Sequence, residues 1–573
     1  MAETFTITSE RVDDIPVLLS QTKRMGIQLL LDKHFSTHGN REGLSLGCMI
    51  EVWLAHILSE ADHRLNHVQP WAEKRLETLR GCIGPTMRAL DLSDDRLEDA
   101  LYILSDDTRW EAFEGALNRR ILRVYELSLE RVRLDSTSAS GYWSVNSEGL
   151  FQFGHSKDRR PDLPQVKVML SSLDPLGLPM AVDVLSGNRA DDPLYIPAVH
   201  RVRKGLKRRG LLYVGDCKMA ALQTRAFIGA GKDFYLCPLS ETQLPKEVLE
   251  DYLCAIWSGG QRLAPVYRPG QDGEQELIAE GYQRFETLTS QVEGKTVTWT
   301  ERRLVVRSIK QAQAAKEALL ARLKKAQTDL EALNQRRRGK RHFRQKEPLQ
   351  KMAQAILERY QVQDMLKVNY QEIVEEHPVR RYRQRPATVR LEREVLVSTS
   401  VDEEAVEKVI QRTGWRVYAT NSPEEQLGLT EAVLAYRNAY IIERSFGRLK
   451  GKPLSVTPMY LQRDDHATGL IRLLSIGLRV LTLLEFVIRR QLAQQEENLA
   501  GLYAGNPKRV TAKPTAERLL EAFQEITLTV IREPNQTRRH LTVLSKLQLR
   551  ILELLGFPLN IYERLCFDSP KPP

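Results

Sequence analysis

The spacing of apolar residues predicts helices in the first part of the chain. Apolar side chains recur at helical intervals in Val17–Phe35, Leu44–Leu58, Leu97–Leu104 and Thr108–Val132, with glycines between these segments. The pattern predicts a helical N-terminal domain over residues 1–130. Such domains often bind DNA through a helix in the major groove, and we expect that role here, although no clear helix-turn-helix pattern is present.

At Val132 the helical spacing gives way to short apolar runs typical of strands. One run leads into Asp135, and Gly210–Val214 leads through Gly215 into Asp216. Further predicted strands are Phe151–Phe153, Gln165–Leu173, Met180–Val184 and Asp233–Leu236, with helices at Ala198–Arg209 and Ala220–Ala230. Three antiparallel strands followed by alternating helix and strand is the order of an RNase H-like mixed sheet. Residues 131–237 are therefore predicted to form the first part of such a core.

Residues 238–412 are predicted to be an inserted α+β domain, although an independent domain also fits the pattern. Strands are predicted around Val266, Leu277–Tyr282, Val297–Trp299, Leu304–Val306 and Val389–Val397, and helices in Lys310–Asn334, Pro348–Val362 and Met365–Glu376. The apolar run Trp415–Thr420 then returns to the main sheet, so residues 413–452 are predicted to be the second part of the core.

The last part of the chain, residues 453–573, is again predicted to be helical. Helices are expected in Asp464–Ala493, Ala516–Ile531 and Leu541–Leu555, for DNA contact or dimerisation. The predicted fold class is therefore α/β: an RNase H-like mixed sheet with a large inserted α+β domain, flanked by N- and C-terminal helical domains.

The charge balance adds a possible partner to this picture. Lys and Arg total 84 against 74 Asp and Glu, which gives a net charge of +10. A basic excess favours a polyanionic partner such as nucleic acid, although many basic proteins bind none. The six cysteines form no CxxC pair, which fits a reducing cytoplasm rather than a zinc ribbon or a disulfide framework.

Neither a secretory signal nor a membrane span is predicted. The N-terminus is polar and acidic, and the most apolar later stretch, Gly469–Ile488, is interrupted by Arg472, Arg479 and Glu485. We expect a protein of the prokaryotic cytoplasm, associated with the nucleoid, and no membrane partner.

Three carboxylates are placed where metal-dependent chemistry would need them. Asp135 and Asp216 end predicted strands that an RNase H-like sheet puts side by side, and Glu443 lies in a predicted helix, Thr430–Leu449. Oxygen ligands of this type suit Mg²⁺. Two metal ions about 4 Å apart can activate the attacking oxygen and stabilise the leaving oxygen in phosphodiester displacement. The hypothesis is a site of two ions held by Asp135, Asp216 and Glu443.

The segment around Glu443 resembles a known signature. Residues 436–450, YRNAYIIERSFGRLK, are similar to the Tyr–Arg–Glu–Lys signature of the DDE insertion-sequence transposases called the YREK superfamily. Tyr436 lies seven residues before Glu443 and Lys450 seven residues after it, as in the signature. The signature's Arg position falls on Ala439, which is a departure, and Arg437 would point to another helix face.

Three other stretches add to the resemblance. Residues 154–165, GHSKDRRPDLPQ, resemble the family's GxSKDxRPDLPQ segment. Residues 177–188 resemble its GLPL…GN segment, and Tyr213–Asp216 resembles the strand with the second Asp. The long separation of Asp216 from Glu443 is similar to that in members with a β-rich insertion.

The resemblance implies a cut-and-paste DNA transposase that acts as a homodimer with Mg²⁺ or Mn²⁺. Its partners would be double-stranded transposon terminal inverted repeats and target DNA. Tyr436 and Lys450 would contact phosphates near the scissile bond, and Arg444 and Arg448, on neighbouring turns of the same helix, would complete a phosphate clamp.

Two dense basic runs in the insertion are also candidate DNA contacts. The first runs from residue 336 to residue 344, and the second from 380 to 385. Phe343 and Tyr382 are interleaved with the cations, which favours nucleic acid over a merely solvated face. The residues of the first run that we expect to contact DNA are Arg336, Arg337, Arg338, Lys340 and Arg341.

Other polar residues have simpler interpretations. Asp158 and Asp162 lie among cations, so charge pairing is expected for both, and Asp191 is expected to cap the next helix. His63 and His67 are spaced like metal ligands but have no third ligand nearby. Two alternative functions stay open: a DDE-fold nuclease without strand transfer, and a catalytically decayed DNA-binding protein.

Overall fold

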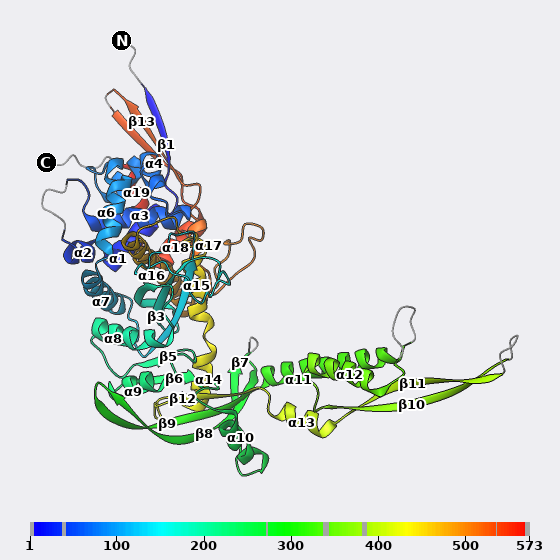
Figure 1. Ribbon diagram of the computed structural model, residues 1–573. Helices are drawn as coiled ribbons and strands as arrows, with labels where there is room; N and C mark the ends of the chain where they lie inside the picture. The colour runs from blue at the N-terminus through cyan, green and yellow to red at the C-terminus, as the bar shows by residue number, and fades with distance from the viewer. Residues whose placement is uncertain are drawn as a thin grey trace.

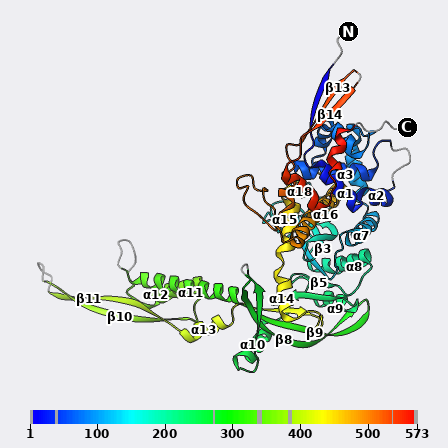
Figure 2. The same cartoon turned by 180° about the vertical axis from the view of Figure 1, so that it is seen from behind.

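The computed structural model describes residues 5–36, 42–270, 273–335, 343–380, 387–534 and 536–567. The molecule consists of a tall body and a long arm that projects from its lower end (Figures 1 and 2). The first and last described segments, in blue and red, both lie in the upper part of the body.

A mixed sheet of nine strands runs through the lower body, in the order β4-β3-β2-β5-β6-β12-β9-β8-β7. β2 (Arg131–Ser140), β3 (Gln165–Leu173) and β4 (Leu178–Ser186) pair antiparallel, and β5 (Leu212–Val214) and β6 (Phe234–Pro238) continue parallel to β2. This is the RNase H-like order, and the predicted fold class is confirmed. The predicted strand Phe151–Phe153 is wrong, because only an isolated bridge joins Gln152 to Gln165.

Helices cover the sheet where the strands are most apolar. Every residue of β3 is buried, which requires cover on both faces of the sheet. The long helix α16 (Asp464–Gln494) packs on β4. Arg479, a charged residue within this largely apolar helix, donates to Glu114 at 2.7 Å. None of the helices in the described ranges is long and apolar enough to cross a membrane.

The first strands of the predicted insertion belong to the same sheet. β12 (Trp415–Thr420) pairs with both β6 and β9 (Lys295–Ser308), and β8 (Gln275–Val292) and β7 (Ala264–Pro269) extend the sheet to its edge. The predicted short strands at 277–282 and 297–306 are parts of one long hairpin.

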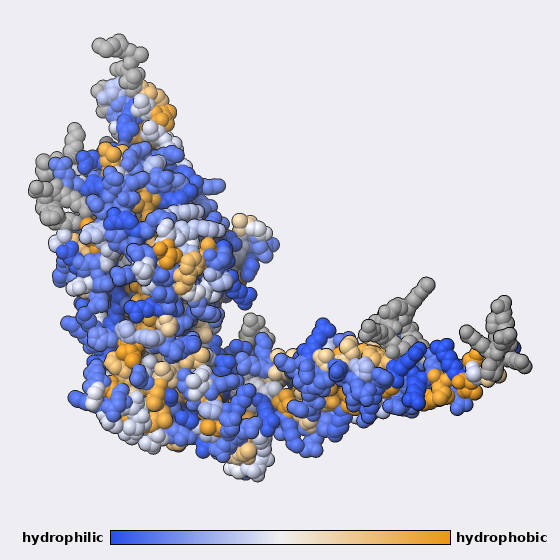
Figure 3. Space-filling model, in the orientation of Figure 1, coloured by the Kyte–Doolittle hydropathy of each residue, from blue (hydrophilic) through white to orange (hydrophobic). Residues whose placement is uncertain are grey.

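The arm is formed by the rest of the insertion and has its own core. It contains α11 (Ile309–Glu331), α12 (Lys346–Tyr360), β10 (Leu366–Val379), β11 (Thr388–Val401) and α13 (Glu403–Gln411). Leu319, Leu330 and Leu357 lie in this separate core, and apolar residues also gather on the arm's surface (Figure 3). The predicted helix Met365–Glu376 is wrong: every residue of β10 pairs with the next strand, β11, and this hairpin overrides the helical pattern.

The two terminal regions fold together. β1 (Thr6–Arg11) pairs with β13 (Thr527–Glu533), which pairs with β14 (Gln536–Leu541). Residues 516–531 are therefore not one helix, since α17 ends at Glu521. The remaining helices are α1 (Ile15–Met25), α2 (Ile27–His34), α3 (Leu46–Glu60), α4 (Val68–Glu73), α5 (Leu76–Ile83), α6 (Asp94–Leu104), α7 (Asp107–Val124), α8 (Tyr195–Leu206), α9 (Leu222–Ala230), α10 (Lys246–Trp257), α14 (Leu429–Arg437), α15 (Tyr440–Lys450), α17 (Ala516–Glu521), α18 (Lys546–Leu555) and α19 (Asn560–Glu563).

Candidate active site

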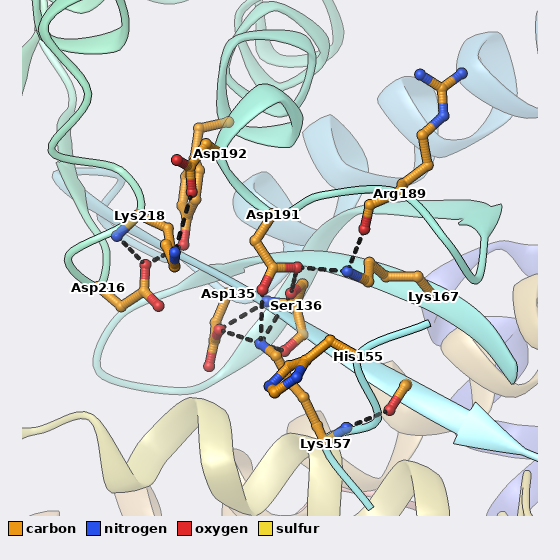
Figure 4. Close-up of polar contacts among 12 residues, drawn as sticks. Asp135, Ser136, His155, Lys157, Lys167, Arg189, Asp191, Asp192, Asp216 and Lys218 are labelled. Carbon is orange, nitrogen blue, oxygen red and sulfur yellow. Dashed lines mark hydrogen bonds and ion pairs between the residues drawn. The ribbon is translucent and has the colours of Figure 1, made fainter. Parts of the chain in front are cut away.

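Asp135 and Asp216 meet on neighbouring parallel strands. β2 and β5 pair in register from Arg131 opposite Leu212 to Arg133 opposite Val214. Asp135 lies two residues beyond Arg133 in β2, and Asp216 lies two residues beyond the end of β5 at Val214, so both acids follow the same end of this pairing. Figure 4 shows the two side chains next to each other. The structure therefore brings the two predicted acids together, although the expectation that Asp135 ends its strand is wrong, because β2 continues to Ser140.

Asp135 is held by a lysine and by the backbone of the next residue. Its Oδ1 accepts from the backbone N–H of Ser136 at 2.7 Å and from Nζ of Lys157 at 3.4 Å. Burial raises the pKa of Asp135 above its usual value, Lys157 lowers it, and the nearby charge of Asp216 raises it again. Two carboxylates that repel each other in this way are stabilised by a cation placed between them.

Asp216 is oriented by a buried tyrosine. Tyr195, the first residue of α8, donates its hydroxyl to Oδ1 of Asp216 at 2.6 Å, and the backbone N–H of Lys218 donates to the same oxygen at 2.9 Å. Burial raises the pKa of Tyr195 well above its ordinary value, so the hydroxyl stays a donor. Within the described residues, the hydrogen bonds to Asp135 and Asp216 all end on Oδ1.

A polar network behind Asp135 was not predicted. Asp191 accepts from Nζ of Lys167 at 2.8 Å and from the hydroxyl of Ser136 at 2.9 Å, and Lys157 lies 3.9 Å from it (Figure 4). The expectation that Asp191 caps a helix is wrong, because its side chain makes no capping bond and serves this network instead. A lysine, the one charged residue of the buried strand β3, was the sequence signal for it.

The glycine at the start of the segment 154–165 has a packing explanation. A Cβ on Gly154 would lie 2.3 Å from the carbonyl oxygen of Gly187, and one on Gly187 would lie 2.0 Å from that of Gln165. The side-chain amide of Gln165 donates to the carbonyl groups of Gly187 and His155. This close packing fixes the loop that carries Lys157 toward Asp135.

The signature segment forms two helices rather than one. α14 ends at Arg437 and α15 begins at Tyr440, so the predicted continuous helix over 430–449 is wrong. Ala439 lies at this break, as the N-cap of α15. Tyr436 and Glu443 therefore lie on different helices, which spacing along the sequence could not reveal.

Tyr436 and Lys450 both reach the surroundings of the two aspartates. The ring of Tyr436 packs on Tyr418 with centroids 4.8 Å apart. Burial raises the pKa of Tyr436 to about 12, and the charge of Asp216 acts in the same direction. Nζ of Lys450 pairs with Asp158, next to Lys157 in the loop. Asp158 is thus charge-paired as expected, and so is Asp162, with Arg160 at 2.8 Å.

Glu443 is exposed and does not join the two aspartates in this arrangement. Within the described ranges, no three Asp, Glu, His or Cys side chains are grouped closely enough to hold a metal ion. α15 is fixed on its other side, because the Ser445 hydroxyl donates to the carbonyl of Gly177 at 3.0 Å. Glu443 and Lys450 are seven residues apart and so lie on one face of α15.

Two of the predicted DNA contacts, Arg444 and Arg448, form ion pairs within the protein. Arg448 is buried and pairs with Glu485 and with Glu517, the latter at 2.8 Å. Arg444 pairs with Glu485 at 2.6 Å. Both guanidinium groups are thus ion-paired on another side of α15 from Glu443, and the expectation that they contact DNA stays a prediction. Arg336, Arg337, Arg338, Lys340 and Arg341 lie outside the described residues.

Comparisons with known proteins give a distant likeness. Neither a protein-family model nor a curated protein matches the sequence. Among solved structures, the chain is similar to a piggyBac transposase in a synaptic complex with hairpin DNA, seen by cryo-EM. The TM-score is 0.31 and the identity 8%, over 88% of this chain and 76% of that chain. A likeness this distant carries no argument about function.

Proposed function

We propose that this protein is a DNA transposase, which cleaves transposon ends and joins them to target DNA. The observation that supports it most is the closeness of Asp135, on β2, to Asp216, just past the end of the adjacent parallel strand β5 of an RNase H-like sheet. Two hard oxygen donors at this point are what phosphodiester transfer assisted by divalent cations requires. The resemblance of residues 436–450 to a transposase signature supports the same function.

Asp135 and Asp216 are the residues that would hold Mg²⁺ or Mn²⁺, with Glu443 as the third carboxylate and two ions per site. When bound, the ions would supply activation of the attacking oxygen and stabilisation of the leaving oxygen. The fit rests on the donor set: both aspartates keep Oδ2 out of the hydrogen bonds among described residues. We assign Glu443 from its place on the helix face of Lys450.

The cations around the pair have a separate task. Lys157, at 3.4 Å from Asp135, and Lys450, paired with Asp158 on the same loop, can exchange these carboxylates for DNA phosphates. Tyr436, packed on Tyr418, offers a hydroxyl beside Asp216 for the same purpose. The partners would be terminal inverted repeats and target DNA, the assembly a homodimer, and the place of action the prokaryotic nucleoid.

The test uses labelled DNA that carries the inverted repeats bounding the gene, incubated with the full chain and Mg²⁺. We expect cleaved ends and a joined product, both lost in Asp135→Asn and Asp216→Asn. Asp251→Asn is the matched control, because Asp251 is an exposed aspartate that pairs with Arg284 and contacts neither Asp135 nor Asp216 among the described residues. Cleavage without a joined product would favour a nuclease, and unchanged activity of Asp216→Asn would remove the proposed metal site.

A further inference from the structure

A cavity lined by arginines lies on the side of α15 away from Glu443. It has a volume of about 420 Å³ and is bounded by α15, α16 and the turn between β3 and β4. Its charged lining consists of Arg444, Arg448, Arg489, Arg490 and Glu485. Tyr440 also lines it and is 62% exposed. None of these residues is used by the proposed cleavage site.

The charges in this cavity do not balance. Glu485 alone accepts from three guanidinium groups: Arg444 at 2.6 Å, Arg489 at 2.5 Å, and Arg448. Arg448 has a second carboxylate behind it, Glu517 at 2.8 Å. Arg490 donates to the carbonyl of Tyr125 at 2.9 Å, which supplies no negative charge. The four arginines thus face two carboxylates, and a positive excess is left in a concave, partly desolvated place.

The titration of the buried groups agrees with this excess. Burial would raise the pKa of Glu485, but Arg448, Arg444 and Arg489 hold it below its ordinary value. Burial lowers the pKa of Arg489, and although Glu485 opposes this, Arg444 and Arg448 lower it further because like charges repel. An additional anion would relieve that repulsion.

We propose that this cavity binds a phosphate group of a single nucleic-acid strand, at a position separate from Asp135 and Asp216. Guanidinium groups bind phosphate oxygens in a two-pronged geometry, which favours phosphate over a halide or a simple point charge. The exposed ring of Tyr440 at the rim gives a flat surface on which the adjoining sugar or base can rest. A volume of about 420 Å³ admits a phosphate with its nucleoside but not a duplex.

The site deepens the proposed function and rests on it only for the identity of the strand, which would be transposon DNA. Glu443 and Arg444 are adjacent on α15, so their side chains diverge by about 100° around the helix. A strand could therefore be held at Arg444 while the bond to be cut lies on the side of Glu443.

The test measures binding of a labelled single-stranded oligonucleotide to the full chain in EDTA, across a series of salt concentrations. In Arg444→Gln we expect binding weakened about tenfold, as for the loss of one charged hydrogen-bond donor. The slope of log affinity against log salt should become shallower by about 0.7, the value for one phosphate of a single strand. Arg109→Gln is the matched control, because Arg109 is an exposed arginine that is likewise paired, with Asp106 at 3.6 Å. Equal affinity and slope in Arg444→Gln and the unmodified chain would overturn the proposal.

Two further experiments test whether the result is specific to a nucleic-acid strand. Tyr440→Ser removes an exposed ring without touching the ion pairs, so it covers the case in which Arg444→Gln fails to fold, and it should also weaken binding about tenfold. Inorganic phosphate and a nucleoside monophosphate are tested by thermal shift; a dependence on Arg444 for these alone, without an effect on the oligonucleotide, rejects the strand assignment. Asp216→Asn should bind the oligonucleotide normally, so loss of cleavage and loss of this site are told apart.

Discussion

Burial raises the pKa of Asp135, and Lys157, its positive neighbour, opposes that rise. Lys157 lies 3.4 Å from Asp135 and lowers its pKa against the effects of burial and of Asp216. In Lys157→Met we therefore expect the pKa of Asp135 to rise further. The ionised form that binds a cation is lost as pH falls through that pKa, so the acid limb of the cleavage profile should move to higher pH. The measurement is the rate of cleavage against pH for both proteins.

Arg159→Met is the control for that profile, because Arg159 is exposed on the same loop and makes no contact with Asp135 among the described residues. An acid limb that stays in place in Lys157→Met would mean that Lys157 does not control the charge of Asp135. Because the pKa of Asp135 lies above its usual 3.8, cleavage activity is expected at pH values above that pKa and is lost at pH values below it.

At this scale the sequence could predict the acids but not their partners. Asp135 and Asp216 each follow an apolar run, and a run plus an acid is a local signal. Asp191 and Tyr195 are brought to the pair by the start of α8, and Lys167 by β3, through contacts that exist only after the sheet has formed. Nothing local distinguishes Asp191 in its network from an ordinary capping residue.

The helix α15 carries Glu443, the proposed third acid, and one substitution tests its role. Glu443 is exposed and shares its face with Lys450, which contacts the loop of Lys157. In Glu443→Gln we expect cleavage to fall by at least a hundredfold, on the order of the loss of a catalytic electrostatic contact, with DNA binding unchanged. Glu431→Gln, an exposed acid on α14, should keep full activity. Full activity in Glu443→Gln would remove Glu443 from the site.

The turn where β4 leaves the sheet is a second element-scale test. A Cβ at Gly187 would lie 2.0 Å from the carbonyl oxygen of Gln165, which is backbone and cannot move aside cheaply. We expect Gly187→Ala to lower the free energy of unfolding by about 1–3 kcal/mol through overpacking. Urea denaturation measures it, with Gly505→Ala as the control because no atom lies within 4 Å of a Cβ there. Equal midpoints in the two variants would contradict the close approach.

Long helices with a regular apolar period were predicted well, whereas strands whose own residue pattern resembles a helix were not. The long helices α11 and α16 follow from periodicity alone. β10 and β13 lie in segments whose pattern predicts helix, yet β10 pairs with the next strand, β11, and β13 pairs with the distant strand β1. A strand within β11, Val389–Val397, was predicted, whereas β1 was not. The break between α14 and α15 was missed for a similar reason, since no Gly or Pro marks it.

On the scale of the whole molecule, the arm is joined to the body at one place. The backbone N–H of Ser308, at the end of β9, donates to the carbonyl of Gly414 at 2.9 Å, so the two ends of the arm are adjacent. The arm's core, with Leu319, Leu330 and Leu357, is separate from that of the body. Replacing residues 310–412 with a short glycine linker should therefore leave the body folded.

The shortened protein separates the arm's role from that of the acids. It lacks the basic runs that the sequence indicates as DNA-binding, so its affinity for duplex DNA should fall. The slope of log affinity against log salt should become shallower by about 0.9 for each phosphate that the arm no longer neutralises. Asp135 and Asp216 are untouched, so Mn²⁺ binding, measured by calorimetry, should persist.

DNA affinity and slope equal to those of the full chain would show that the basic runs only face solvent. Loss of the body's melting transition would instead show that the arm is part of the fold, because the body's sheet would then depend on contacts that cross the junction at Ser308 and Gly414.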